Sequence, residues 1–175
     1  MIKEEIIFIL MFVTLICQSQ QYETLKIIRS EFQEISKEED IEIILAIDYK
    51  NVNAQERQMI EAYRAAATCM MANYVFSSIS KLKYFNKGKK QLEQLILEDK
   101  EVENVYLRLL LQLNIPRMLG YHEDIEEDIA YLQSYMAKAP IDLSYKQTMI
   151  KNLVGVTDKN ELKDALLLIQ LVDEG

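Results

Sequence analysis

The side chains that could carry metal chemistry in this chain are few. Its one histidine, His122, opens the most acidic stretch, residues 122–128. Transition-metal sites use several imidazole or thiolate ligands in fixed geometry, and this chain has neither a second histidine nor a Glu-x-x-His pair. The sequence therefore favours a solvated helix start over a weak Ca²⁺ site, and it predicts no metal. The acidic stretch could in principle offer His122, Glu123, Glu126 and Glu127 as cation ligands.

Nucleophilic catalysis has equally little support. A nucleophile, histidine and acid triad would have to use His122, and the chain contains no Gly-x-Ser-x-Gly turn. Cys69 lies among Ala and Met residues on a predicted helix, which is typical of a small buried side chain. The chain also has no Gly-x-Gly-x-x-Gly motif and no Gly-Lys-Ser/Thr phosphate loop. We therefore expect no catalytic residue and no cofactor.

Residues 81–90 form a basic exception in an acidic chain. They contain five lysines interleaved with Tyr84 and Phe85, whereas the whole chain carries a net charge of −8. This cluster could bind an acidic peptide or a phosphate, or it could be a solvated helix face with its aromatic residues turned inward. If helical hairpins stack, a groove would gather polar groups near the helix break at Pro116. The predicted binding residues are Tyr84, Lys87, Lys90, Asn114, Arg117 and Tyr121.

Residues 54–120 read as three consecutive helices that would position these groups. Asn53 followed by Glu56 fits a capping box at the start of the first helix. The apolar stripe of this helix continues to about Ser77, and Ser80 could cap the next helix. Gly88 lies inside the second helical pattern, where it costs roughly 1 kcal/mol against Ala. Close packing against a partner helix is one reason for a glycine there.

Helical patterns also flank this central stretch. They cover residues 22–35, 41–47, 125–136 and 143–153, with a last helix after Thr157. Residues 43–47 could pass for a strand, but no second strand is present to pair with them, so a helix is predicted. Asp124 with Glu127 is expected to cap one helix, and Gly155 to follow the end of another. Only 4 Gly and 2 Pro favour long helices. The predicted fold is all-α, with antiparallel helical hairpins in an irregular helical bundle or a regular array.

The first residues have the features of an export signal. Residues 6–16 are apolar apart from Thr14, a run shorter than the roughly 20 residues of a membrane span and suited to a signal-peptide core. We predict a signal peptide over residues 1–19 and a single α-helical domain over residues 20–175 of a periplasmic or secreted protein. The alternatives are lipidation at Cys17, or an uncleaved helix that packs on the protein or anchors it in a membrane.

The stretch LEQLILEDKEVENVYLRLLLQL, residues 92–113, resembles the second helix of one tetratricopeptide repeat, an acidic turn and the first helix of the next. Residues 85–121 are similar to a recurring element of small uncharacterised exported bacterial proteins. This resemblance covers about half of the chain. It implies a tetratricopeptide-like right-handed array of helical hairpins and a scaffold that binds a protein or peptide.

The net charge of the chain makes some classes of binding partner less favourable. The net charge of −8 and the pI of about 4.8 disfavour non-specific binding to nucleic acid or to an anionic membrane surface. We expect no nucleic-acid partner, and membrane contact only through residues 1–19 if these are not cleaved. The leading expectation is a protein- or peptide-binding scaffold in the cell envelope. The alternatives are an enzyme or small-ligand carrier with a site inside the helical bundle, and a purely structural anchor. The sequence does not indicate which oligomeric state the protein has.

Overall fold

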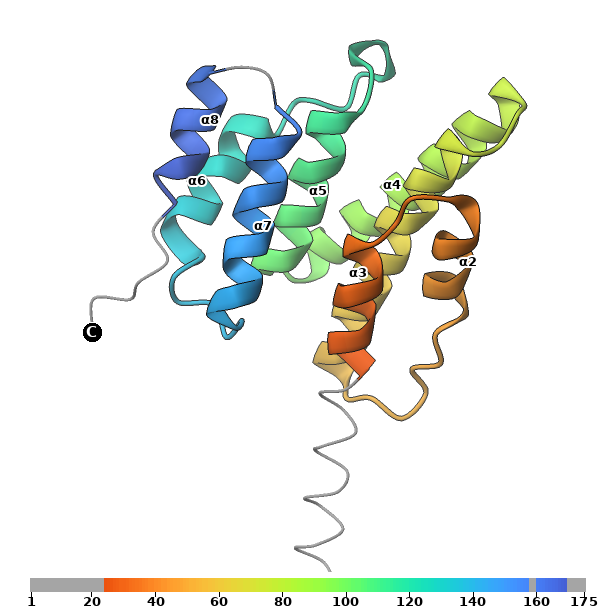
Figure 1. The fold of residues 1–175 in the computed structure, drawn as a ribbon, viewed down its shortest axis with the longest axis horizontal. Coiled ribbons are helices and arrows are strands. Elements are labelled where there is room, and N and C mark those ends of the chain that lie inside the picture. Colours follow the sequence, from red (N-terminus) through yellow and green to blue (C-terminus); the bar gives the residue numbers. More distant parts are fainter. Residues whose placement is uncertain (1–23, 158–159, 170–175) are drawn as a thin grey trace, which may run out of the picture. The chain divides into compact units, whose positions relative to one another are not determined.

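The computed structural model describes residues 24–157 and 160–169, and every regular element in those ranges is helical (Figure 1). This confirms the all-α prediction, including the helical assignment of residues 43–46. Whether the helices form a tetratricopeptide-like array or an irregular bundle stays a prediction. The elements are a helix over residues 24–33, α2 (Glu38–Ala46), α3 (Ala54–Met70), the 3₁₀ turn η1 (Met71–Asn73), α4 (Ser78–Glu98), α5 (Val102–Asn114), the 3₁₀ turn η2 (Arg117–Leu119), α6 (Ile125–Tyr135), α7 (Leu143–Gly155) and α8 (Asn160–Leu167).

Contacts between Cα atoms divide the chain into two compact units, Met1–Gly88 and Lys89–Gly175. Helix α4 begins in the first unit and ends in the second. Helices that follow one another along the chain pack together in both units: α2 against α3 in the first, and α5 against α6 and α7 against α8 in the second. The prediction of one helical domain over residues 20–175 stays a prediction.

The predicted signal peptide, residues 1–19, lies outside the described residues, and so does Cys17. Among the helices that the structure does describe, none combines the length and the apolar run that crossing a membrane requires.

The start of α3 follows the sequence signal, whereas its end does not. The Asn53 Oδ1 atom accepts the Glu56 backbone N–H at 2.9 Å, and the Asn53 amide donates to the Glu56 carboxylate at 3.2 Å. Helix α3 ends at Met70, before the end of the apolar stripe, and α4 begins at Ser78 rather than near Ser80. A turn of 3₁₀ helix, η1, continues the apolar spacing beyond α3, so periodicity alone does not locate this boundary.

Gly88 lies where α3 and α4 approach closely. A Cβ atom at this position would lie 2.4 Å from the Ala65 carbonyl oxygen and 2.6 Å from the Cys69 Sγ atom. Only a hydrogen atom fits there, which confirms that close packing explains the mid-helix glycine. Cys69 is buried in the same contact, as predicted, and its thiol donates to the Phe85 carbonyl oxygen at 3.4 Å.

The second unit is organised around α5. All eight side chains from Val102 to Leu109 are buried, so this helix is covered all round. Its Tyr106 hydroxyl accepts a hydrogen bond from the Asn152 amide of α7 at 3.0 Å. The largest fully buried side chains of this unit are those of Leu92, Tyr106, Leu107, Leu109, Leu132, Met136 and Met149.

Two of the predicted helix ends are wrong. Asp124 precedes α6, but its side chain makes no capping bond, because it accepts a hydrogen bond from the Gln112 amide instead. Gly155 is the last residue of α7 rather than the residue after it. The left-handed backbone conformation belongs to Gly120, which closes η2 with φ of 61°.

Candidate functional site

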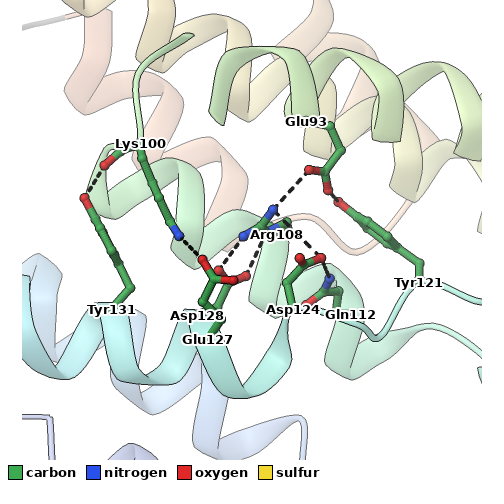
Figure 2. Close-up of polar contacts among 9 residues, drawn as sticks. All are labelled: Glu93, Lys100, Arg108, Gln112, Tyr121, Asp124, Glu127, Asp128 and Tyr131. Atoms are coloured by element: carbon green, nitrogen blue, oxygen red, sulfur yellow. Dashed lines mark hydrogen bonds and ion pairs between the residues drawn. The ribbon is translucent and has the colours of Figure 1, made fainter. Parts of the chain in front are cut away.

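A buried guanidinium group joins three helices of the second unit (Figure 2). Arg108 of α5 binds Asp128 of α6 through two parallel bonds, from Nε to Oδ2 at 2.8 Å and from Nη2 to Oδ1 at 2.5 Å. Its Nη1 atom donates to Glu93 Oε2 of α4 at 3.0 Å. The Asp124 Oδ2 atom lies 3.8 Å from the same Nη1 atom. We call Arg108, Glu93, Asp124 and Asp128 the Arg108 cluster.

The spacing of polar residues on α5 produces this arrangement. Asn104, Arg108 and Gln112 recur every four residues, so they share one face of a helix whose other faces are largely apolar. The Asn104 amide donates to the Asp99 carbonyl oxygen at 3.2 Å, and the Gln112 amide donates to Asp124 Oδ2 at 3.0 Å. Because α5 is buried, the donor groups of these side chains bond within the protein, whereas the Asn104 Oδ1 and Gln112 Oε1 atoms have no partner among the described residues.

The charges of the cluster act mainly on one another. Burial alone would lower the pKa of Arg108, but the hydrogen bonds that it donates to Asp128 and the charges of Glu93 and Asp124 together raise it, so the side chain stays a cation. Burial raises the pKa of Asp128 above its ordinary value, and the bonds from Arg108 oppose this only in part. Both carboxylate oxygens of Asp128 accept hydrogen bonds from Arg108, and Glu93 accepts another, so the cluster holds α4, α5 and α6 together.

Two tyrosines extend the cluster at its edges. The Tyr121 hydroxyl donates to Glu93 Oε1, and the Lys89 ammonium group lies 4.4 Å from the centre of the Tyr121 ring. Burial raises the pKa of Tyr131, whose hydroxyl donates to the Lys100 carbonyl oxygen. The Lys100 ammonium group donates to Glu127 at 2.5 Å, and this bond lowers the pKa of Glu127.

An open hollow of about 1050 Å³ lies beside the Arg108 cluster in the second unit. Its wall contains the Gln112 side chain, whose amide nitrogen donates to Asp124. The buried Oε1 atom of Gln112 has no hydrogen-bond partner among the residues that the structure describes. The only histidine is also part of the lining, and its Nε2 atom lies 3.3 Å from the Ile115 carbonyl oxygen. The described residues of its lining are Gln112, Leu113, Ile115, Arg117, Gly120, His122, Glu123, Ile125, Glu126, Val156, Thr157 and Leu162.

The first unit has a smaller hollow, of about 460 Å³, beside the end of α2. Arg64, one of the cationic residues in its lining, donates to the carbonyl oxygens of Ile44, at 3.2 Å, and of Leu45. The same guanidinium group lies 5.2 Å from the centre of the Tyr49 ring. Arg64 is therefore committed to the carboxyl end of α2, where unpaired carbonyl groups favour a cation.

The six predicted binding residues occupy different settings. Tyr84 and Lys87 belong to the first unit, where Tyr84 is half-buried and Lys87 is exposed on α4. A groove that gathers Tyr84 and Lys87 with Asn114 and Arg117 stays a prediction. In the second unit, Arg117 lines the large hollow.

The other three predicted residues are not among the described lining residues of this hollow. Tyr121 is buried and points to the Arg108 cluster. Asn114 donates to the Leu110 carbonyl oxygen at 2.8 Å, and Lys90 is exposed on α4.

Sequence reasoning missed Gln112 and Arg108. These two polar residues lie four positions apart inside the otherwise apolar run YLRLLLQL, residues 106–113. Polar residues at that spacing in an apolar run were the signal that could have indicated them. Among the residues that the structure describes, no group of three His, Cys, Asp or Glu side chains is arranged to hold a metal ion. Comparison of this chain with protein-family models, with curated proteins and with solved structures finds no match.

Proposed function

We propose that this protein is an exported helical scaffold of the bacterial cell envelope that binds an extended peptide segment of a partner protein. The binding site we propose is the hollow of about 1050 Å³ in the second unit. The observation that carries the proposal is the buried Gln112 Oε1 atom in the wall of this hollow, because no described residue donates a hydrogen bond to it. A buried carbonyl oxygen without a partner costs free energy that a ligand N–H group would recover.

The lining of the hollow suits a peptide with an apolar side chain. Five aliphatic residues contribute to it, and they provide a surface on which such a side chain would lose contact with water. A peptide N–H group or a lysine ammonium group would donate to Gln112 Oε1. The aliphatic residues are Leu113, Ile115, Ile125, Val156 and Leu162.

The charges at the hollow favour a basic peptide. Glu123 and Glu126 are exposed in its lining and Asp124 adjoins Gln112, whereas Arg117 is the one lysine or arginine among the lining residues that the structure describes. A lysine or arginine next to the apolar side chain would complement this acidic excess. Arg117 would then donate to carbonyl oxygens of the bound backbone.

The Arg108 cluster supports this function indirectly. Arg108 and Gln112 occupy successive turns of α5, and both bond to carboxylates at the start of α6. These bonds fix α5 against α6, and the two helices supply Gln112, Leu113, Ile125 and Glu126 to the lining. This part of the wall is therefore in place before a peptide arrives. A preformed site loses less conformational entropy on binding.

The enzyme or small-ligand carrier is the weaker candidate. Such a site should bring perturbed ionisable groups to face a ligand. The groups with raised pKa values in the second unit include Arg108 and Asp128, and these two face each other.

The binding site is tested with the full chain and a phage-displayed library of random peptides. We expect enrichment of peptides that place Lys or Arg beside an aliphatic residue. Calorimetry with a synthetic enriched peptide should show that the double variant Glu123→Lys/Glu126→Lys binds about tenfold or more weakly. The control is Glu38→Lys/Glu39→Lys, an equal charge reversal at exposed residues of α2. Equal binding by both double variants, or enrichment of acidic peptides, would contradict the proposal.

Export is tested by the intact mass and the fractionation of the natively expressed protein. The proposal predicts a mature chain that begins near Gln20 and is found outside the cytoplasm. A full-length chain in the soluble cytoplasmic fraction would refute the envelope localisation while leaving the peptide-binding test unaffected.

A further inference from the structure

The connection from α3 to α4 exposes a group of large apolar side chains. Phe76 is fully exposed in this connection, and Ile79, in the first turn of α4, is 82% exposed. Leu82 follows one turn later and is 49% exposed. Single exposed apolar residues are common on protein surfaces, but three within seven residues of one helix start form a patch.

The segment that carries this apolar patch is rich in lysine and has no acidic residue. Lys81, Lys83 and Lys87 are all exposed on the first half of α4. Between Glu61 and Glu93 the chain contains no Asp or Glu, although the whole chain carries 28 of them. The local charge is therefore opposite in sign to the net charge of −8.

One apolar residue and two lysines share a face of α4. Ile79, Lys83 and Lys87 follow one another at four-residue spacing, which places them in one row along a helix. Phe76 precedes the helix, Ile79 and Leu82 lie in its first two turns, and Lys83 and Lys87 extend toward its middle. This arrangement lets the aromatic and aliphatic groups enter an apolar layer while the ammonium groups stay at its charged boundary.

We propose that this segment, Phe76, Ile79 and Leu82 with Lys81, Lys83 and Lys87, inserts into the surface of an anionic membrane. We call these six residues the α4 tip. The lysines would bind lipid phosphates and carboxylates, and the three apolar side chains would enter the acyl boundary. An acidic peptide would satisfy the lysines but would leave a fully exposed Phe76 without an apolar partner, so a lipid surface fits both observations.

This inference goes beyond the peptide-binding function, because it rests on other residues and another unit of the chain. It also goes beyond the expectation that a membrane is contacted only through residues 1–19. The net negative charge of the protein opposes approach to an anionic surface, so the contact has to be made by the basic tip, and it should weaken as salt is added.

The chain contains no tryptophan, so a single introduced tryptophan reports on its own surroundings by its fluorescence. In the full chain, Phe76→Trp should shift its emission to shorter wavelength with vesicles of phosphatidylcholine and phosphatidylserine, and brominated lipid should quench it. Pure phosphatidylcholine vesicles should do neither. The control is Leu97→Trp, at a residue with 82% exposure near the other end of α4, beside Glu98. An unshifted emission from the Phe76→Trp variant, or equal shifts at both positions, would overturn the proposal.

Vesicle co-sedimentation measures separately what the lysines and what the apolar side chains contribute to membrane binding. The triple variant Lys81→Gln/Lys83→Gln/Lys87→Gln should bind phosphatidylserine vesicles roughly a hundredfold more weakly, and Phe76→Ser/Ile79→Ser about tenfold or more weakly. The control Lys37→Gln/Lys138→Gln/Lys151→Gln removes the same charge from exposed positions elsewhere. All the altered side chains are exposed, so the helical circular dichroism spectrum should be unchanged.

Two outcomes of this assay would overturn the proposal. Undiminished binding by both α4-tip variants would mean that another segment, such as residues 1–19, contacts the lipid. Binding of the α4 tip to a polyglutamate peptide without binding to phosphatidylserine vesicles would mean that its partner is an acidic protein segment.

Discussion

The helices within the first unit and those within the second are joined by different kinds of contact. In the first unit, α3 and α4 approach so closely at Gly88 that a Cβ atom would lie 2.4 Å from the Ala65 carbonyl oxygen. In the second unit, α4, α5 and α6 meet through the charges of the Arg108 cluster. The first contact depends on side-chain volume, and the second depends on charge and hydrogen bonding.

This difference determines which substitutions each unit tolerates. A close helix contact lined by Ala and Gly is sensitive to any added atom and insensitive to pH. A buried ion cluster keeps its geometry only while each charge has a partner, because an unpaired buried charge is costly. Substitutions in the two contacts should therefore affect the two units selectively.

Removal of the central cation should have the largest effect. Arg108→Met leaves Asp128 buried without its partner, and we expect a loss of about 3–5 kcal/mol in the free energy of unfolding. Urea denaturation gives the size of the loss, and hydrogen exchange should locate it in α5 and α6. Arg117→Met, at an exposed position, is the control. The double variant Arg108→Met/Asp128→Leu should recover much of the loss, and no recovery would mean that apolar packing by the Arg108 stem dominates.

A methyl group at Gly88 should have the next largest effect. Gly88→Ala should destabilise the protein by about 1–3 kcal/mol, because overpacking against backbone atoms outweighs the roughly 1 kcal/mol gain in helix propensity. Gly155→Ala is the control, because no atom lies within 4 Å of its Cβ position and the helix should tolerate it. Faster hydrogen exchange should appear in α3 and the first half of α4. Destabilisation confined to α5 and α6 would contradict the comparison.

The sequence predicted the first contact better than the second. The position of Gly88 inside a helical pattern indicated close packing, and Asn53 with Glu56 indicated the start of α3, since both signals are local. The Arg108 cluster depends on residues that are up to 35 positions apart, from Glu93 to Asp128, and 28 acidic residues offered too many pairings. The apolar run around Arg108 and Gln112 indicated a buried helix, but only the fold shows which carboxylates lie opposite.

The lining of the hollow was likewise predictable only where it depends on local sequence. Arg117 was predicted near the break at Pro116 and lines the hollow, because local sequence marks the end of a helix. Val156 and Leu162 join the same lining from the other end of the second unit, and their contribution depends on tertiary packing. Tyr121, another predicted binding residue, is buried and donates a hydrogen bond to Glu93, a contact between distant parts of the chain that local sequence does not indicate.

Loss of the Tyr121 hydroxyl should have a smaller effect than either of the first two substitutions. Tyr121→Phe removes the bond to Glu93 while the ring keeps its contact with Lys89, so we expect a loss of about 1 kcal/mol. Tyr135→Phe, at an exposed side chain of α6, is the control. Chemical denaturation of both variants measures the difference, and equal stability would show that the edge of the cluster contributes little.

The smallest effect should come from Glu127 and should depend on pH. Its pKa lies below the ordinary value of 4.5 because Lys100 donates a hydrogen bond to it. The stability that it contributes is therefore present above about pH 4.5 and is lost as pH falls through the lowered pKa. Glu127→Gln should be slightly less stable than the wild type at pH 7, and the difference should disappear in acid. Glu126→Gln, a matched change one residue away, should not reproduce this pH profile.

Hydrogen exchange of the full chain with and without a library-selected peptide tests the central claim most directly, because it locates the bound peptide. Peptide binding in the hollow predicts slower exchange in residues 112–126 and 156–162, which contain its lining. The same protection should weaken in Glu123→Lys/Glu126→Lys. Protection confined to residues 74–90, or no protection in the second unit, would contradict the claim.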